Sequence, residues 1–237
     1  MKKRVKKFIL IGFFLFLGLL YVIRFGGIAI LRLYIETGVG NCQKIPVLCA
    51  VPLPVVVQSK TDPRYIASLV EYQLPQVQIS VPKEFRVIKQ SVERGYYKKF
   101  KNKTAGSVIY LLYEPNDFFI RLFTVSKKAG INNDYDFIKR VMEAKLKEIN
   151  GLSDAFFVIM KGIFTPDLAD QSNLKMLKFS MPGYKGFISY NTQDKQNYFN
   201  CDVITNDGYF KIYIKDKLGV LDLDKVFSII STIKKID

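Results

Sequence analysis

The feature that most constrains this chain is an uncharged run of 16 apolar residues, from Phe8 to Ile23. A helix of that length spans about 24 Å, slightly less than the ~30 Å hydrocarbon core of a bilayer. Lys6, Lys7 and Arg24 flank the run and can reach toward the headgroups. The apolar pattern continues beyond Arg24. The sequence therefore predicts a membrane-spanning and juxtamembrane helix over residues 8–35.

A cleaved signal peptide is the alternative, because a basic start followed by an apolar run is typical of one. No small-x-small cleavage site follows Ile23 at the usual distance. Lipid attachment needs a small residue before the modified cysteine, whereas Asn41 precedes Cys42 and Leu48 precedes Cys49. We therefore expect the helix to be retained.

The charges around the run indicate its direction. Five of the first seven residues are Lys or Arg, so the positive-inside rule places the N-terminus in the cytoplasm. In a bacterium, the rest of the chain would then lie on the periplasmic side of the inner membrane. The sequence predicts four parts: a basic tail (1–7), the helix (8–35), a proline-rich tether with a short helix (36–73) and an extracytoplasmic α+β domain (74–237).

Alternating apolar residues predict a sheet in the last of these parts. Asn206-Asp207-Gly208 is a strong hairpin signal between two such runs. Three- and four-residue apolar spacing predicts helices over 135–149 and 222–236. The fold class expected is α+β, an antiparallel sheet covered by helices. Strands are expected over 77–81, 85–92, 96–100, 107–113, 118–126, 156–164, 174–181, 186–192, 198–205 and 209–215.

The order of these segments resembles the Mog1/PsbP-like family. The resemblance covers residues 74–237 and rests on ISVPKEFRVI, SVIYLLYEP, FFIRLFTVS, YDFIKRVMEAKLKEI and VFSIISTIKKI. It implies an α/β/α sandwich, and a role as a binding or assembly factor. No site residue is carried over, because the match is in pattern rather than in a signature.

The chain contains no histidine. This excludes Ser-His and Cys-His nucleophile pairs and imidazole-based metal sites, including the histidine metal positions of plant family members. No glycine-rich phosphate loop is present. We expect no cofactor, no metal and no catalysis, and hence a non-catalytic binding or assembly module. The alternatives are a histidine-free hydrolase pairing Ser180 with a lysine, or a thiol-disulfide protein using Cys42 and Cys49.

Cys42 and Cys49 could close an eight-residue loop in an oxidising compartment. Their spacing is wider than the C-x-x-C of redox pairs, so a structural bridge and two free thiols both stay open. Cys201 lies in an alternating run and is expected to be a small buried residue.

Basic residues are concentrated in RGYYKKFKNK, residues 94–103. Lys98, Lys99, Lys101 and Lys103 form the predicted patch for an anionic partner. A solvated hairpin face, anionic lipid headgroups and nucleic acid are the other readings, and an extracytoplasmic location makes nucleic acid unlikely. The expected partners are the lipid bilayer through Phe8–Ile23 and a protein of the cell envelope. The sequence does not indicate an oligomeric state.

Overall fold

The computed structural model describes residues 26–39, 54–88, 98–165, 174–193 and 196–236. An eight-stranded sheet with the order β1-β7-β8-β9-β10-β6-β5-β4 dominates it, and a three-stranded sheet has the order β11-β3-β2. The strands are β1 (Val55–Gln58), β2 (Leu69–Leu74), β3 (Val77–Pro82), β4 (Phe85–Ile88), β5 (Lys98–Asn102), β6 (Val108–Pro115), β7 (Lys175–Met181), β8 (Tyr184–Gln193), β9 (Gln196–Ile204), β10 (Gly208–Asp216) and β11 (Lys234–Lys235).

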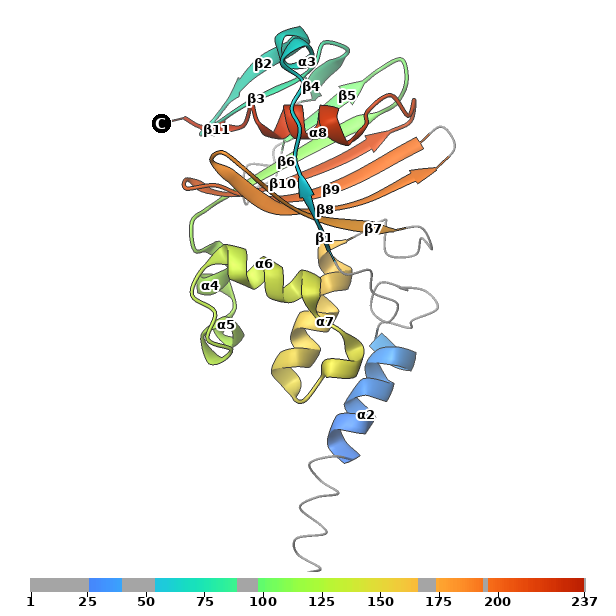
Figure 1. The fold of residues 1–237 in the computed structure, drawn as a ribbon, viewed down its shortest axis with the longest axis vertical. Helices are drawn as coiled ribbons and strands as arrows, with labels where there is room; N and C mark the ends of the chain where they lie inside the picture. The colour runs from blue at the N-terminus through green and yellow to red at the C-terminus, as the bar shows by residue number, and fades with distance from the viewer. Residues whose placement is uncertain (1–25, 40–53, 89–97, 166–173, 194–195, 237) are drawn as a thin grey trace, which may run out of the picture.

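The elements form three layers (Figure 1). The three-stranded sheet, α3 (Pro63–Ser68) and α8 (Leu223–Ile230) lie on one face of the large sheet. The opposite face carries α4 (Phe118–Leu122), α5 (Thr124–Lys128), α6 (Asp134–Glu143), a short 3₁₀ helix (Leu146–Glu148) and α7 (Leu152–Phe164). Each interface has its own apolar core. Below, the two faces of the large sheet are called the α8 face and the α6 face.

Alternation along the strands produces these two cores. In β10, Phe210, Ile212 and Ile214 point into the core of the α8 face, and Tyr209 points into the core of the α6 face, as expected when successive side chains point to opposite faces. The predicted hairpin joins β9 to β10. A Cβ atom on Gly208, whose φ is +157°, would lie 2.4 Å from a carbonyl oxygen, so only glycine fits there.

Helix α6 begins at Asp134, directly after its cap Asn133. The Asn133 side chain accepts a hydrogen bond from the Asp136 amide at 2.9 Å, which satisfies one unpaired donor of the first turn. The helix ends at Glu143 rather than continuing to Ile149. Its buried stripe includes Phe137, and the other buried apolar members are Ile138, Val141 and Met142.

Two predicted strands are helices instead. Residues 156–164 belong to α7, whose buried side chains recur at helical spacing, and residues 118–126 form α4 and α5. The buried carboxylate of Asp134 accepts hydrogen bonds from the Phe118 and Phe119 amides at 3.0 and 2.9 Å. This long-range cap starts α4, and the Phe119 ring stacks on Phe137 at 5.0 Å. The tertiary contacts override the local β pattern.

The predicted membrane-spanning helix must be corrected. The described part of residues 8–35 contains α2 (Gly27–Tyr34), eight residues long, followed by a π-helical turn (Ile35–Val39). No helix in the described ranges is long and apolar enough to cross a membrane. The Phe8–Ile23 run lies outside the described residues.

Helix α2 is held against the rest of the protein at one side. Ile35 is fully buried, and the Arg32 guanidinium donates two hydrogen bonds to the Ile149 carbonyl at 3.2 and 2.8 Å. Ile30 and Leu33 are more than half exposed. The apolar pattern of this segment thus belongs partly to packing on the α6–α7 connection.

The sheets also differ from the predicted class. Strand β1 pairs in parallel with β7, so the large sheet is mixed rather than purely antiparallel. Strand β1 and all of β2 except Leu74 lie before residue 74, and yet they belong to the two sheets. Helix α3 lies in the part expected to contain a short helix; it starts at Pro63, where Asp62 caps the Arg64 amide at 2.9 Å, and ends at Ser68, before β2.

The described residues contain no disulfide. Cys201 is the cysteine that they include, and its thiol is free. Cys42 and Cys49 lie outside the described residues. Cys201 is buried as expected, and its burial raises the pKa of its thiol, with the neighbouring Asp202 carboxylate as a second cause. It is therefore an unreactive core residue.

Candidate functional site

Lysines and tyrosines gather on four neighbouring strands on the α6 face of the large sheet. One row runs from Lys99 on β5 to Tyr110 on β6 and Tyr213 on β10. The next row contains Lys101 on β5, Val108 on β6, Lys215 on β10 and Tyr198 on β9, so Val108 separates the two lysines. We call the three lysines and three tyrosines of these rows the lysine–tyrosine face. Directly opposed residues in an antiparallel sheet lie about 5 Å apart, so the two rows, with Val108 between Lys101 and Lys215, form one continuous surface.

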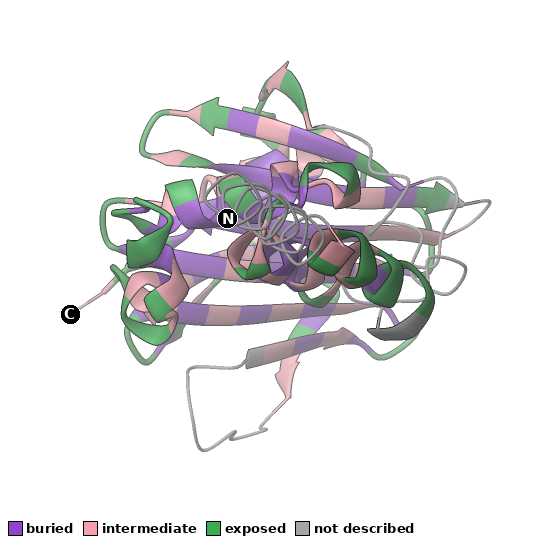
Figure 2. Cartoon of the chain, turned by 90° about the horizontal axis from the view of Figure 1, so that it is seen from below, coloured by how far each residue is buried: buried purple, intermediate pink, exposed green. Residues whose placement is uncertain are grey.

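The helices on the α6 face do not cover the lysine–tyrosine face. The first row continues beyond Tyr213 to Asn200 and Ser189, which are both fully buried, because α6 packs on β8 and β9. Lys99, Tyr110 and Tyr213 are only partly buried. Seen from below, the helices cover the middle of the sheet and leave strands in view on either side (Figure 2).

The charges on this face are unbalanced. Lys99 Nζ lies 5.1 Å from the Tyr110 ring centroid, and Lys215 Nζ lies 5.2 Å from that of Tyr198. Among the described residues, Lys99, Lys101 and Lys215 form no ion pair. Cation–π contacts of partly exposed amines are worth only about 0.5–1 kcal/mol, and leave N–H donors for a ligand. The face therefore offers three positive charges to a carboxylate or phosphate.

A buried polar cluster borders the face on its inner side. The fully buried Asp202 carboxylate accepts hydrogen bonds from Tyr209 at 2.6 Å and from Lys211 at 2.7 Å. Lys211 also donates to the Phe164 carbonyl at the end of α7, at 2.8 Å. Burial raises the pKa of Asp202, and burial followed by the Asp202 charge raises that of Tyr209 well above its ordinary value. This pair neutralises Lys211 internally, so Lys211 does not add to the positive face.

The predicted basic patch is divided by the structure. Lys99 and Lys101 share the α6 face, while Phe100 between them is buried on the α8 face. Lys103 is exposed in the β5–β6 turn. Lys98 lies on β5 opposite Leu111; the structure describes its backbone but not its side chain.

Sequence reasoning missed the remaining members of the face: Tyr110, Tyr198, Tyr213 and Lys215. The alternation of Lys211, Tyr213 and Lys215 in KIYIK was a usable signal, since it places all three on one side of a strand. The register that brings this strand beside β6 and β9 could not be read from the alternation alone.

The serine proposed for a hydrolase lies at the end of β7. Ser180 is exposed, and its direct cross-strand neighbour is Lys185, a pairing that sequence reasoning overlooked. Lys185 Nζ lies 4.4 Å from the centroid of the Tyr135 ring, and Lys178 Nζ lies 5.8 Å from the same ring. No hydrogen bond joins Ser180 to a lysine amine within the described residues. The arrangement as it stands does not activate the hydroxyl.

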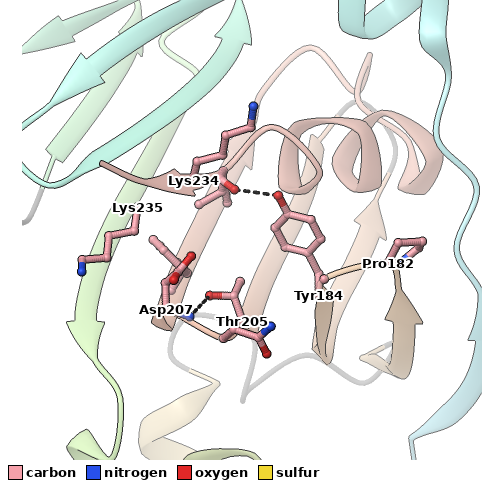
Figure 3. A pocket seen from close by; sticks show the side chains of 10 residues that line it. Pro182, Tyr184, Thr205, Asp207, Lys234 and Lys235 are labelled. Atoms are coloured by element: carbon pink, nitrogen blue, oxygen red, sulfur yellow. Dashed lines mark hydrogen bonds between the residues drawn. The ribbon is translucent and has the colours of Figure 1, made fainter. Parts of the chain in front are cut away.

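A concavity of about 290 Å³ lies where the β7–β8 and β9–β10 turns meet β11 (Figure 3). Tyr184 spans it and donates its hydroxyl to the Ile233 carbonyl at 2.7 Å. The Asp207 amide donates to Thr205 Oγ1 at 3.1 Å. The Tyr184 hydrogen bond joins the C-terminal segment to the sheet, and the Asp207 hydrogen bond fixes the β9–β10 turn. Both bonds serve the structure of this corner.

Comparison with known proteins gives no further lead: no protein-family model matches the chain, and no curated protein matches it.

Proposed function

We propose that this chain is a non-catalytic binding module whose lysine–tyrosine face binds an acidic segment of a protein partner. The single observation that carries the proposal is the shared face of Lys99, Lys101 and Lys215, with no carboxylate paired to them among the described residues. Lysines on β5 and β10, the two strands that flank β6, suit an extended acidic peptide that crosses these strands, whose carboxylates would meet them in turn.

The aromatic rings argue against a nucleic-acid strand. Base stacking needs ring faces that are open. Tyr110 instead packs on Tyr213, with ring centroids 5.8 Å apart and planes tilted by 45°, and Lys99 lies over the Tyr110 ring. The rings thus support the lysines rather than form a stacking platform.

The position of the lysine–tyrosine face favours an extended peptide over a membrane surface as the partner. Helices α4 to α7 project from the same side of the sheet (Figure 1). A planar assembly of headgroups would meet these helices before the partly buried strand residues, whereas a peptide can follow the step between helices and sheet. The Mog1/PsbP-like resemblance, with its implied assembly role, stays a prediction that agrees with this proposal.

The test is a charge-reversal triple variant, Lys99→Glu, Lys101→Glu and Lys215→Glu, titrated with a fluorescein-labelled peptide of alternating Glu and Gly. We expect binding to weaken at least about tenfold near 0.1 M salt, from three contacts of up to ~1 kcal/mol each. The matched control reverses three exposed lysines elsewhere, Lys83, Lys127 and Lys147, giving the same net charge. An equal loss in both triple variants would reduce the effect to net charge and refute the site.

Two further probes decide the partner class. Single-stranded DNA and vesicles containing anionic lipid are titrated against the same two variants. If either probe binds more tightly than the peptide and depends on the same three lysines, the acidic protein segment is the wrong partner.

A further inference from the structure

Two lysine amines meet at one aromatic ring on the α6 face, on the strands nearest to β1. Lys185 Nζ lies 4.4 Å and Lys178 Nζ lies 5.8 Å from the centroid of the Tyr135 ring. The ring itself stacks on Phe187, with centroids 5.9 Å apart. Two ammonium groups beside one ring repel each other, and cation–π contacts of such accessible amines are weak. An anion held by both amines would remove this repulsion.

A serine hydroxyl lies beside the two lysines. Along β7, Lys178 and Ser180 are two residues apart, so their side chains point to the same side of the sheet. Met176, two residues earlier, belongs to the core of the α6 face. Ser180 is directly opposite Lys185 on β8, and its hydroxyl has no hydrogen-bond partner within the described ranges. The three side chains therefore form one group of donors on the α6 face.

The acidic neighbours of this group are engaged elsewhere. The carboxylates of Asp134 and Asp136, on either side of the tyrosine, accept hydrogen bonds from amides of α4 and from the N-cap side chain of α6. Asp202, on the neighbouring strand β9, is in the ion pair described above. Lys178 and Lys185 form no ion pair with any residue that the structure describes. Both charges are thus available to a ligand.

A phosphoryl group matches these donors better than a single carboxylate does. It carries a charge of about −1.5 to −2 at pH 7 and has three strong acceptor oxygens. Two ammonium groups and one hydroxyl are present to donate to them. A carboxylate brings one charge and two oxygens, so it would leave one of the two amines without a counter-charge.

The surface around the donors is open. Ser180 and Lys185 are exposed, and β1, the neighbour of β7, is the last strand in the described order of the large sheet. Val56 lies beside Lys178 on β1 and is 75% exposed. Small-molecule sites bury most of their ligand in a cleft, whereas a phosphorylated side chain of a larger partner reaches an open surface. Val56 offers the chain of that partner an apolar contact.

We propose that Lys178, Ser180 and Lys185 bind the phosphoryl group of a phosphorylated protein segment, with Tyr135 holding the two amines at the site. The proposal does not rest on the lysine–tyrosine face, because the two surfaces share no residue and lie on different strands. The triple variant that tests the lysine–tyrosine face leaves all three donors in place, so either proposal can fail without the other.

The test follows the phosphorus NMR signal of a short Gly-Ser peptide with one phosphoserine, titrated with the full chain. Lys178→Met together with Lys185→Met should weaken binding about tenfold, and Ser180→Ala about threefold. Arginine at both lysine positions should keep most of the affinity, since it retains the charges and donors. The matched control is Lys83→Met together with Lys127→Met, at two exposed lysines elsewhere. An equal loss in both methionine pairs would overturn the site.

Competitors identify the ligand. A peptide with two adjacent glutamates in place of the phosphoserine has a similar charge and should displace the phosphopeptide at least about fivefold less well. Equal displacement would show that the lysines select charge alone and would refute the phosphoryl site. Inorganic phosphate that binds more tightly than the phosphopeptide would refute the protein segment as the ligand. A phosphopeptide signal that stays unchanged at millimolar protein would contradict the proposal altogether.

Discussion

Lys161 provides the sharpest test of the packing described above. The residue lies within α7 and has no solvent-exposed surface. Its amine donates a 3.3 Å hydrogen bond to the Ala144 carbonyl at the end of α6. Burial lowers the pKa of Lys161 from 10.5 to about 7, although the Glu143 charge acts in the opposite direction. A neutral amine thus occupies a position that an apolar side chain of similar length could fill.

The magnitude follows from proton linkage. Between pH 7 and 10.5 the unfolded chain binds a proton at this lysine and the folded chain does not, so the free energy of unfolding rises with pH by about 1.4 kcal/mol per unit. Below pH 7 both states are protonated and the contribution is constant. Above pH 10.5 both are neutral and the penalty vanishes. At pH 7 the penalty is about 4 kcal/mol.

Lys161→Met removes this penalty and also a hydrogen bond worth about 1 kcal/mol. We therefore expect the variant to be more stable than the natural protein by about 3 kcal/mol at pH 7. The advantage should shrink as the pH rises and reach zero near pH 10. Urea unfolding followed by far-UV circular dichroism at pH 7, 8, 9 and 10 measures it; the chain has no tryptophan for fluorescence.

Lys127→Met is the control, because Lys127 is exposed on α5 and should show no pH-dependent difference from the natural protein. An advantage of Lys161→Met that stays constant between pH 7 and 10 would refute the neutral buried amine. A variant that is less stable at pH 7 would refute it as well.

Three further predictions concern stability, each measured by urea unfolding. Asp222→Ala should cost about 1 kcal/mol, because Asp222 caps the Lys225 amide at 2.9 Å; Asp222→Asn should restore most of it, and equal loss in both would rule out the cap. Gly208→Ala should cost more than about 1 kcal/mol, and a silent substitution would contradict the 2.4 Å approach to the Glu114 carbonyl. Lys211→Met should cost about 3 kcal/mol by leaving the buried Asp202 carboxylate unpaired. Adding Asp202→Asn should recover part of that, and additive losses would disprove the coupling.

Much of the sheet was predictable because its local signals agree with its tertiary environment. The strands β7 to β10 follow the alternation of the sequence. In the turn between β9 and β10, glycine is the residue that fits at position 208. The starts of α6 and α8 were also predictable, since Asn133 and Asp222 act through amides only three residues away. Such a helix cap forms between residues close in sequence, so it does not depend on the rest of the fold.

The remaining elements depend on distant partners. The segment that forms α4 has a strand-like sequence, and its helix starts on a carboxylate 15 residues further along. The middle of α7, Ala155 to Met160, is a continuous apolar run, which periodicity alone does not assign to helix or strand. The lysine–tyrosine face escaped prediction for the same reason, because its members come from four strands whose register is visible only in the folded sheet.

The contact between Arg32 and the Ile149 carbonyl has a mechanical consequence. A force applied to the chain before Gly26 would be transmitted to the folded domain through the two Arg32 hydrogen bonds and the buried Ile35 side chain. That load would fall on the corner between α6 and α7 rather than on a strand. Tension from the N-terminal side would thus loosen the helical layer while the hydrogen-bonded ladders of the sheet stay intact.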